Sequence, residues 1–273
     1  MGQIVAGFGV PHSPHAPEQV RKDPTRSETR LYGRVAEAIV ASRADALIVF
    51  HNDHFNTFFL NNWPIFAIGV ADKTAGPNDP TVMPRYDLPV QTALATQIHQ
   101  HAVAAGFDLS VLRKFELDHS ILVPLHFMPP ARAIPIIPII INSFVPPLPS
   151  SQRCFALGQA VRAAVEAFPQ PLRVAVLASG HFSLEIGGPQ IEPDNRHGVP
   201  DPGWTDRVTT LLRDGDIKTL VQEATFQRMQ RAGNIGGELL NWIAMLGVTG
   251  AGKADWIEEE RDEGNSYAFW QLN

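Results

Sequence analysis

The chain has 273 residues, and its 28 Asp and Glu outnumber its 22 Lys and Arg to give a formal net charge of -6 at pH 7. This acidic balance, without any long basic run, argues against electrostatic binding of nucleic acid or of anionic membranes. A hydrophobic fraction of 44% suffices to bury a sizeable core, as one large domain or as two fused halves. The single cysteine, Cys154, excludes an internal disulfide and a cysteine-based zinc site within one chain.

The first residues lead straight into a strand-like segment with no charged stretch before it, so we expect no signal peptide. No apolar run reaches the roughly 18 residues expected of a membrane span. We therefore expect a cytoplasmic protein that does not enter a membrane.

Apolar runs that predict strands alternate with segments of helical spacing. Strands are expected at residues 4–10, 46–50, 63–70, 108–112, 174–178 and 267–272. Helices are expected at residues 27–43, 90–105, 155–168 and 236–246, and most of the chain after residue 181 is expected to be helical. In the first of these helices the residues predicted to share the buried face are Leu31, Val35, Ile39 and Val40.

Prolines and glycines interrupt this pattern in three places. Residues 71–88, rich in Gly, Pro and Asp, predict a long loop. Residues 134–141 form a β-branched run in which two prolines predict an irregular or edge strand. The proline-rich residues 145–149 are the best candidate linker, but no clear boundary accompanies them, so we expect one domain over residues 1–273.

Strands that alternate with helices indicate an α/β fold with a mixed β-sheet core flanked by helices. Ligands of such folds gather beyond the carboxyl ends of the strands. His12, His54 and His181 all fall at positions of that kind.

Three short segments, far apart in the chain, each place a metal-binding type of side chain at the end of an apolar run: His12, His54 and Glu238. Two imidazoles and one carboxylate form the facial set that holds non-haem Fe(II) and leaves coordination positions open. The prolines around His12 stiffen its loop, which suits a preorganised ligand. His15 lies in the same rigid loop and is the alternative ligand.

His54 and Glu238 also have purely structural interpretations. His54 follows Asn52 and Asp53, whose short side chains organise a turn, although Asp53 could instead orient a metal-bound histidine. Glu238 lies in a helix expected to be amphipathic, where a glutamate beside the core face is usually solvated. The glycine-rich residues 233–237 before it permit a close backbone approach.

Two further histidines are candidates for acid–base chemistry, because an imidazole titrates near neutral pH. His119 follows Asp118, which is equally well interpreted as a helix N-cap, and His181 follows a predicted strand. A Ser-His-Asp hydrolase is unsupported, since no Gly-x-Ser-x-Gly elbow occurs.

Together these segments resemble the catalytic subunit of the class III extradiol ring-cleavage dioxygenases, the family typified by protocatechuate 4,5-dioxygenase. The likeness runs in order over most of the chain, which makes it far more specific than any one motif. It covers residues 9–14, 51–54, 66–69, 118–125, 153–166 and 237–242.

The resemblance implies ferrous iron as the cofactor, with dioxygen and a catechol-like or dihydroxy-heteroaromatic ring as substrates. By motif, the iron ligands of the family correspond to His12, His54 and Glu238. The histidine of its Asp-His segment corresponds to His119, which implies a contact to substrate or oxygen. The fold of the family is a sandwich-like α/β arrangement with strands flanked by helices.

One segment departs from the family pattern. The family reads Gly-Gly-Leu-Ser-His after the late strand, and the last residue is its acid–base catalyst, whereas this chain has Leu184 at that position. His181 lies three residues earlier. We take His181 as the acid–base residue, with His119 and Glu185 as alternatives that must meet the same positional requirement.

We also expect a homo-oligomer, which some relatives extend with a small helical subunit. Arg85, Arg113 and Arg153 are candidates to bind a substrate carboxylate, although surface salt bridges are their commoner role. Two rival functions stay open at this point. One is a metal-dependent hydrolase that holds zinc with the same three ligands. The other is a non-catalytic interaction protein like Memo, which resembles this fold.

Overall fold

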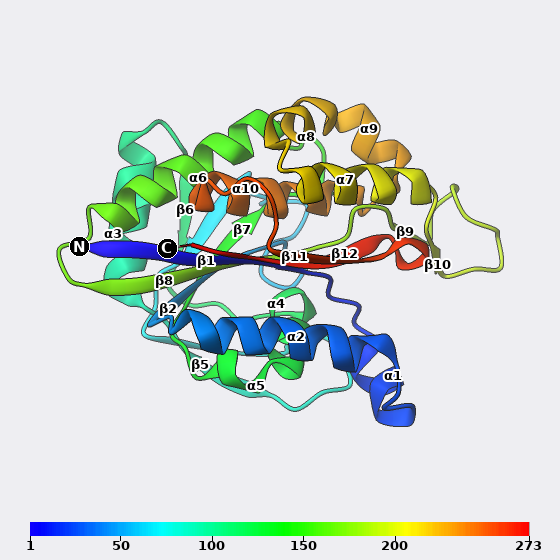
Figure 1. The fold of residues 1–273 in the computed structure, drawn as a ribbon, viewed down its shortest axis with the longest axis horizontal. Helices are drawn as coiled ribbons and strands as arrows, with labels where there is room; N and C mark the ends of the chain where they lie inside the picture. The colour runs from blue at the N-terminus through cyan, green and yellow to red at the C-terminus, as the bar shows by residue number, and fades with distance from the viewer. Residues whose placement is uncertain (273) are drawn as a thin grey trace.

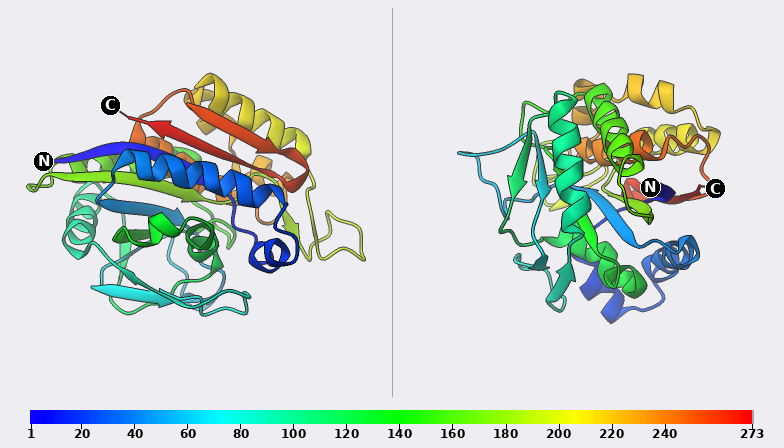
Figure 2. Two further views of the ribbon diagram at one scale, coloured as in Figure 1. Left: turned by 60° about the horizontal axis from the view of Figure 1, so that its bottom comes forward. Right: turned by 90° about the vertical axis from the view of Figure 1, so that its left-hand side faces the viewer.

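The computed structural model describes residues 1–272, which form a mixed eight-stranded sheet between two layers of helices (Figures 1 and 2). The strand order is β11-β12-β1-β8-β2-β7-β3-β6. These strands are β1 (Gly2–Val10), β2 (Ala46–His51), β3 (Phe66–Gly69), β6 (Leu109–Leu112), β7 (Ile136–Ile141), β8 (Leu172–Ser179), β11 (Trp256–Glu260) and β12 (Asn265–Gln271). The central strands β1, β8, β2 and β7 are parallel, whereas the β11–β12, β12–β1 and β7–β3 pairs are antiparallel. The predicted α/β fold with a mixed sheet is confirmed.

Helices cover both faces of the sheet, and each layer encloses its own hydrophobic cluster (Figure 1). The upper layer in that view contains α6 (Ser151–Glu166), α7 (Pro202–Asp214), α8 (Ile217–Glu223), α9 (Phe226–Arg231) and α10 (Leu239–Thr249), and α3 (Thr92–Ala104) packs against α6 at the left. The lower layer contains α1 (Ala16–Lys22), α2 (Ser27–Ser42), α4 (His119–Phe127) and α5 (Pro129–Arg132). Within the described residues, none of these helices has the length and apolar character needed to cross a bilayer.

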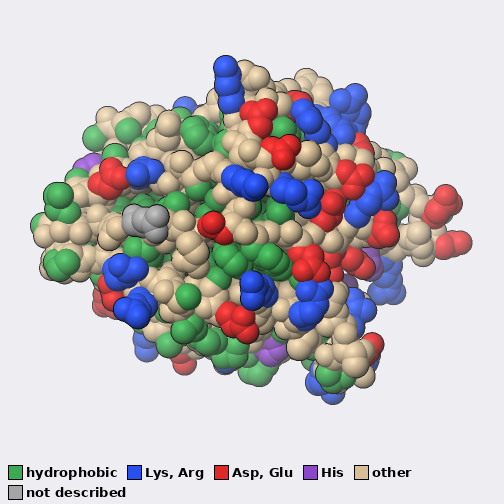
Figure 3. All heavy atoms as spheres, in the orientation of Figure 1, with side chains coloured by type: hydrophobic (Ala, Val, Ile, Leu, Met, Phe, Trp, Pro, Cys, Tyr) green, Lys and Arg blue, Asp and Glu red, His purple; other side chains and the backbone are tan. Residues whose placement is uncertain are grey.

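The remaining elements are short. Two small antiparallel sheets pair β4 (Lys73–Gly76) with β5 (Tyr86–Pro89) and β9 (Glu185–Ile186) with β10 (His197–Gly198). Two 3-10 turns, η1 (Gly236–Glu238) and η2 (Arg261–Glu263), precede α10 and β12. On the face shown in Figure 3, acidic and basic side chains are interspersed and no broad basic field appears.

Helix α10 differs from its prediction, because it is buried along its whole length rather than amphipathic. It packs between the sheet and α6 at very short range. A Cβ added to Gly158 of α6 would lie 2.1 Å from the Ala244 carbonyl oxygen, and one added to Gly9 of β1 would lie 2.2 Å from the Trp242 ring. Glycine is required at both positions, since any side chain would force the helix away from its neighbours.

Two local predictions on the lower face are also wrong. Val40 is 57% exposed, because it lies one residue beyond Ile39 and so about 100° around α2 from the buried stripe. Residues 71–88 are not a continuous loop, since they contain β4 and most of β5. Strands of four residues give too short an alternation to stand out beside the Gly and Pro of the turn between them.

The prolines predicted an irregular or edge strand over residues 134–141, but β7 is an interior strand of the sheet. It pairs with β2 on one side and β3 on the other. The pairing with β3 covers Ile139 to Ile141 and stops before Pro138, which is paired with β2 alone. The sheet therefore accommodates a proline where one of the two ladders ends.

Candidate metal centre

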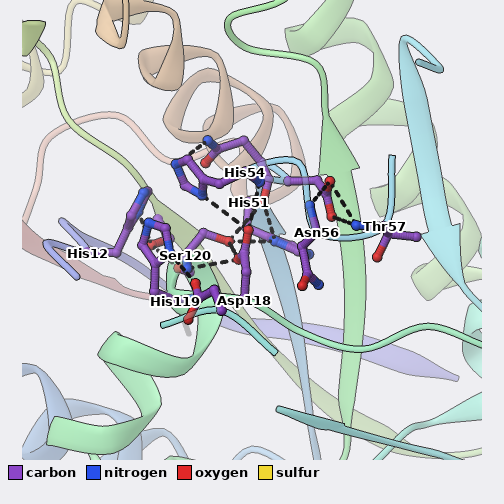
Figure 4. A network of polar contacts seen from close by, with 12 residues as sticks. His12, His51, His54, Asn56, Thr57, Asp118, His119 and Ser120 are labelled. Atoms are coloured by element: carbon purple, nitrogen blue, oxygen red, sulfur yellow. Dashed lines mark hydrogen bonds and ion pairs between the residues drawn. The ribbon is translucent and has the colours of Figure 1, made fainter. Parts of the chain in front are cut away.

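The predicted site residues come from separate segments that meet at one end of the sheet. His12 follows β1, His54 follows β2 and His181 follows β8, and these three strands are parallel neighbours. Their carboxyl ends therefore share one edge, where α/β folds bind ligands. His119 begins α4, and Glu238 closes η1 where α10 starts. Figure 4 shows His12, His54 and His119 converging from these elements.

The Glu238 carboxylate lies at the centre of this cluster and is completely buried. Its Oε1 lies 3.1 Å from His12 Nε2 and 3.4 Å from His54 Nε2. Its Oε2 accepts the His181 backbone N–H at 2.9 Å and lies 3.0 Å from His181 Nδ1. Burial favours the protonated acid, but the contacts with His12, His181 and His54 outweigh it and hold the pKa of Glu238 well below its usual range.

His12 is held with Nε2 facing the carboxylate. Its Nδ1 lies 2.8 Å from Ser179 Oγ, and that hydroxyl donates its own proton to the Ser120 carbonyl at 2.6 Å. The hydroxyl must therefore accept from His12 Nδ1–H, which leaves the lone pair on Nε2. Burial lowers the pKa of His12 to about 4, more than Glu238 raises it, which favours the neutral imidazole that a metal ion requires.

His54 is oriented in the same way, by a carboxylate. Asp118 Oδ2 accepts the His54 backbone N–H at 2.7 Å and lies 3.1 Å from its Nδ1, so Nε2 again faces Glu238. Burial opposes protonation, but Asp118 and Glu238 together raise the pKa of His54 to about 10. A bound cation would replace that proton. Asp118 is also the N-cap of α4, through the Ser120 N–H.

Asp53, the residue considered for orienting a metal ligand, has another role. Its carboxylate accepts the backbone N–H groups of the three residues that follow the turn, Asn56, Thr57 and Phe58. Asn52 is the neighbour that reaches the site, since its Nδ2 lies 3.0 Å from Glu238 Oε1 and 2.9 Å from His54 Nε2.

In the part of the chain that the structure describes, two sets of three side chains lie close enough to bind one metal ion. In the first, ligand atoms of His12, His54 and His119 lie within 4.8 Å of one another, and in the second those of His12, His181 and Glu238 do. The predicted set of His12, His54 and Glu238 is joined through one oxygen, Glu238 Oε1, which both Nε2 atoms face. Two imidazole nitrogens and a carboxylate oxygen suit ferrous iron, once the cation has displaced the proton of His54. The residues present therefore fit the implied cofactor.

A cavity of about 390 Å³ opens over the cluster, within the size range of small-molecule sites. Its wall includes all five predicted residues together with apolar and aromatic side chains. Its lining residues include His12, His54, His119, His181, Glu238, Tyr32, Leu184, Ile235 and Tyr267. Leu184, which replaces the histidine of the family pattern, is thus a wall residue.

The alternative residues named from the sequence lie outside the carboxylate cluster. His15 is exposed at the start of α1, where its ring lies 6.3 Å from that of His197 at the cavity wall. Glu185 is buried, but it accepts the Asn234 N–H at 2.5 Å rather than lining the cavity. Arg85 pairs with Glu116, a surface contact.

The other two arginines proposed for a substrate carboxylate are also outside the cavity. Arg153 lies over the rings of Phe66 and Phe107, and Arg113 is exposed. Arg196, which the sequence did not single out, does line the cavity. The sequence likewise missed the orienting roles of Ser179 and Asp118. Only Asp118 carried a signal, as the neighbour of His119.

Comparisons with known proteins give matches over most of the chain. Residues 6–266 match the family described as the catalytic LigB subunit of aromatic ring-opening dioxygenase. Gallate dioxygenase from Pseudomonas putida is 31% identical over 162 residues, which are 58% of this chain and 46% of that protein, so the match spans about half of its length. The 2,3-dihydroxyphenylpropionate/2,3-dihydroxicinnamic acid 1,2-dioxygenase of Klebsiella pneumoniae is 27% identical over 80% of this chain and 82% of its own.

A solved structure shares the fold. It is an uncharacterized protein from Escherichia coli K12, JW3007, with a TM-score of 0.60 and 14% sequence identity over 98% of this chain and all of the other. At 14% identity, this structural similarity supports the fold of the chain and nothing about its function.

Proposed function

Because the chain belongs to the family of catalytic LigB subunits of aromatic ring-opening dioxygenases, we propose that His12, His54 and Glu238 hold ferrous iron for extradiol cleavage of a catechol-like ring. The observation that carries this proposal is the position of Glu238, a fully buried carboxylate encircled by three imidazoles inside the cavity. A buried anion is costly unless cations compensate it, and a metal ion would supply that compensation.

The two oxygens of Glu238 separate the roles of its neighbours. Oε1 faces the Nε2 atoms of His12 and His54, whose Nδ1 atoms are already committed to Ser179 and Asp118. Oε2 faces His181, whose ring has no such orienting partner on its other side among residues 1–272. This division favours His12 and His54 as ligands beside Oε1. It leaves His181 as the group that handles protons.

When bound, ferrous iron would supply open coordination positions and electron transfer between the ring and dioxygen. The protein's own residues would orient the substrate and move its protons. His181 and His119 both line the cavity and could accept the proton of a substrate hydroxyl. Leu184, Ile235 and the two tyrosines of the wall would exclude water from the reacting groups.

The substrate is proposed to be an aromatic ring with two adjacent oxygen substituents. The names of the relatives, gallate dioxygenase and dihydroxyphenylpropionate dioxygenase, supply two of the test compounds. Oxygen uptake by anaerobically purified protein supplied with ferrous ion would be measured with gallate, 2,3-dihydroxyphenylpropionate, catechol, 2-aminophenol and dihydroxypyridine. Turnover of at least one compound, dependent on ferrous ion, is expected. Hydrolysis without oxygen uptake would contradict the proposal.

The ligand assignment has its own test, iron content measured after anaerobic loading and desalting. His12→Ala, His54→Ala and Glu238→Ala should each lose the iron and the oxygen uptake, because each removes one of only three protein ligands. His181→Ala should keep the iron and lose most of its kcat, by about 10²–10⁴-fold for an acid–base group. If His181→Ala loses the iron and His54→Ala keeps it, the ligand set is His12, His181 and Glu238 instead.

A further inference from the structure

A residue from a segment remote in sequence contacts the site through His119. Asp79 lies between β4 and β5, 40 residues before His119, and its Oδ2 accepts the His119 backbone N–H at 2.9 Å. The same oxygen forms a short hydrogen bond with His119 Nδ1. We propose that Asp79 is a positioning residue for His119, which it fixes with Nδ1 protonated and Nε2 directed to the reacting groups. The catalytic consequence rests on the function proposed for His119 above.

The segment that carries Asp79 is itself held in place. The Leu117 N–H donates to the Ala75 carbonyl at 2.9 Å, and the Asn78 N–H donates to the Leu117 carbonyl at 3.2 Å. Gly76 packs so closely that an added Cβ would lie 2.2 Å from the Leu117 oxygen. Asp79 Oδ1 accepts the N–H of Thr81 at 3.2 Å. The carboxylate is therefore fixed on both oxygens and can define the direction of a partner.

The hydrogen bond between Asp79 and His119 Nδ1 determines whether His119 Nε2 can accept a proton. In a neutral imidazole one nitrogen donates and the other accepts, so a carboxylate at Nδ1 leaves the lone pair on Nε2. The His119 ring stacks on His54 at 4.1 Å between centroids and lies 5.7 Å from the His12 ring. His119 thus stacks on His54, lies beside His12 and lines the cavity. Because Asp79 engages Nδ1, Nε2 is the nitrogen left to accept from a substrate hydroxyl.

A merely structural role for Asp79 makes a different prediction. Because the His119 N–H lies in the first turn of α4, Asp79 also satisfies a helix-terminal donor, and its loss would lower stability whatever the ring does. The tautomer of His119 separates the two roles. It can be read in the metal-free protein, so the result does not depend on whether a substrate has been found.

The first experiment is ¹⁵N NMR of histidine-labelled, metal-free protein at pH 8, with His119→Gln to assign the resonance. The wild type should show the Nδ1–H tautomer at His119. Asp79→Ala should shift the tautomer of His119 toward Nε2–H. Asp79→Asn keeps a neutral acceptor oxygen and should retain Nδ1–H. The asparagine variant therefore still tests the proposal if the alanine variant misfolds. A wild-type Nε2–H form, or the same spectrum in Asp79→Ala as in the wild type, overturns the proposal.

The second experiment is a double-mutant cycle in the iron-loaded enzyme. Asp79→Ala should lower kcat about 10- to 100-fold with smaller change in KM, as expected when a partner that orients a reactive group is lost. In a His119→Ala background the same substitution should cost almost nothing more. Asp87→Ala, an exposed carboxylate of β5 in the same small sheet, is the matched control and should leave kcat unchanged. Full additivity of the two losses would show that Asp79 does not act through His119.

Discussion

At the scale of single residues, the hydrogen-bond partner of Nδ1 sets the orientation of each imidazole in the site. Three of the four rings direct Nδ1 to a partner away from Glu238: His12 to Ser179, His54 to Asp118 and His119 to Asp79. Such partners fix the tautomer and the orientation of a ligand before any metal arrives. Only His181 directs Nδ1 to the central carboxylate itself.

The Ser179 hydroxyl is the partner whose removal changes least else, so it gives the cleanest test of this organisation. Ser179→Ala should weaken ferrous-ion affinity about 10- to 100-fold, because His12 would lose the acceptor that holds its Nδ1–H. Competition with a chelator under anaerobic conditions measures the change. Ser143→Ala is the control, since Ser143 is equally buried and its Oγ has no partner within the described residues. Equal affinities in the two variants would refute the role of Ser179.

The sequence was sufficient to single out the five residues that converge, but not to assign all of their contacts. His12, His54 and Glu238 carry motif signals because each ends an apolar run with a metal-binding type of side chain. Ser179 and Asp79 carry none, because their roles depend on which distant segment the fold brings against them. Which oxygen of Glu238 faces which ring is equally a tertiary property.

At the scale of elements, the position of Glu238 depends on how closely α10 approaches the sheet. Gly9 of β1 faces the ring of Trp242, and Gly180, next to His181, would place a Cβ only 2.7 Å from the Cβ of Glu238. These glycines let the helix bring its first residues against the carboxyl ends of the strands. The periodicity of α10 could not reveal this, since a helix buried on all sides has no polar face to detect.

Substituting glycines in two different settings tests this packing. Gly9→Ala should lower the free energy of unfolding by about 1–3 kcal/mol, because the new methyl group overlaps the Trp242 ring. Gly33→Ala should raise it by about 0.5–1 kcal/mol, since Gly33 lies within α2 with nothing within 4 Å of its added Cβ. Urea denaturation compares both with the wild type. Stabilisation by Gly9→Ala would show that α10 does not approach β1 this closely.

Asp201 connects two helices of the upper layer, and its ionisation makes the stability of their contact depend on pH. It is the N-cap of α7, through the Trp204 N–H, and it pairs with Arg228 of α9. Although burial opposes it, the hydrogen bond from Arg228 lowers the pKa of Asp201 below its usual range. A carboxylate with a lowered native pKa contributes stability above its unfolded pKa, near 4, and that contribution is lost as the pH falls through the native value.

Asp201→Asn keeps the capping oxygen but removes the charge. At pH 7 it should lower the free energy of unfolding by about 0.5–1 kcal/mol, the range for a partly exposed ion pair. The difference from the wild type should shrink below pH 4, where the wild-type carboxylate also becomes protonated. Asp201→Ala removes the cap as well and should cost about 1 kcal/mol more at every pH. A difference between Asp201→Asn and the wild type that does not change between pH 7 and pH 3 would exclude this linkage.

At the scale of the whole molecule, one sheet joins two hydrophobic layers, and the site lies where its parallel strands end. The fold class followed from the alternation of strands and helices, but the order of the strands did not. Strand β12, the last in the chain, lies beside β1, the first, and no local pattern records such a pairing. The homo-oligomer and the small helical partner stay predictions, which light scattering of the purified chain can address.

Cys154 can report whether residues 1–273 unfold as the single domain that the sequence predicts. It lies in α6, fully buried in the upper cluster, and burial raises the pKa of its thiol. The native protein should therefore not react with a thiol reagent at pH 8, and one thiol per chain should react in denaturant. For one cooperative domain, the midpoint of labelling in urea should coincide with the loss of helical circular dichroism. Ferrous ion, which would bind the folded site alone, should shift both midpoints upward together. If labelling precedes the loss of helix by a clear margin, the layer that contains α6 unfolds separately and the chain is not one domain.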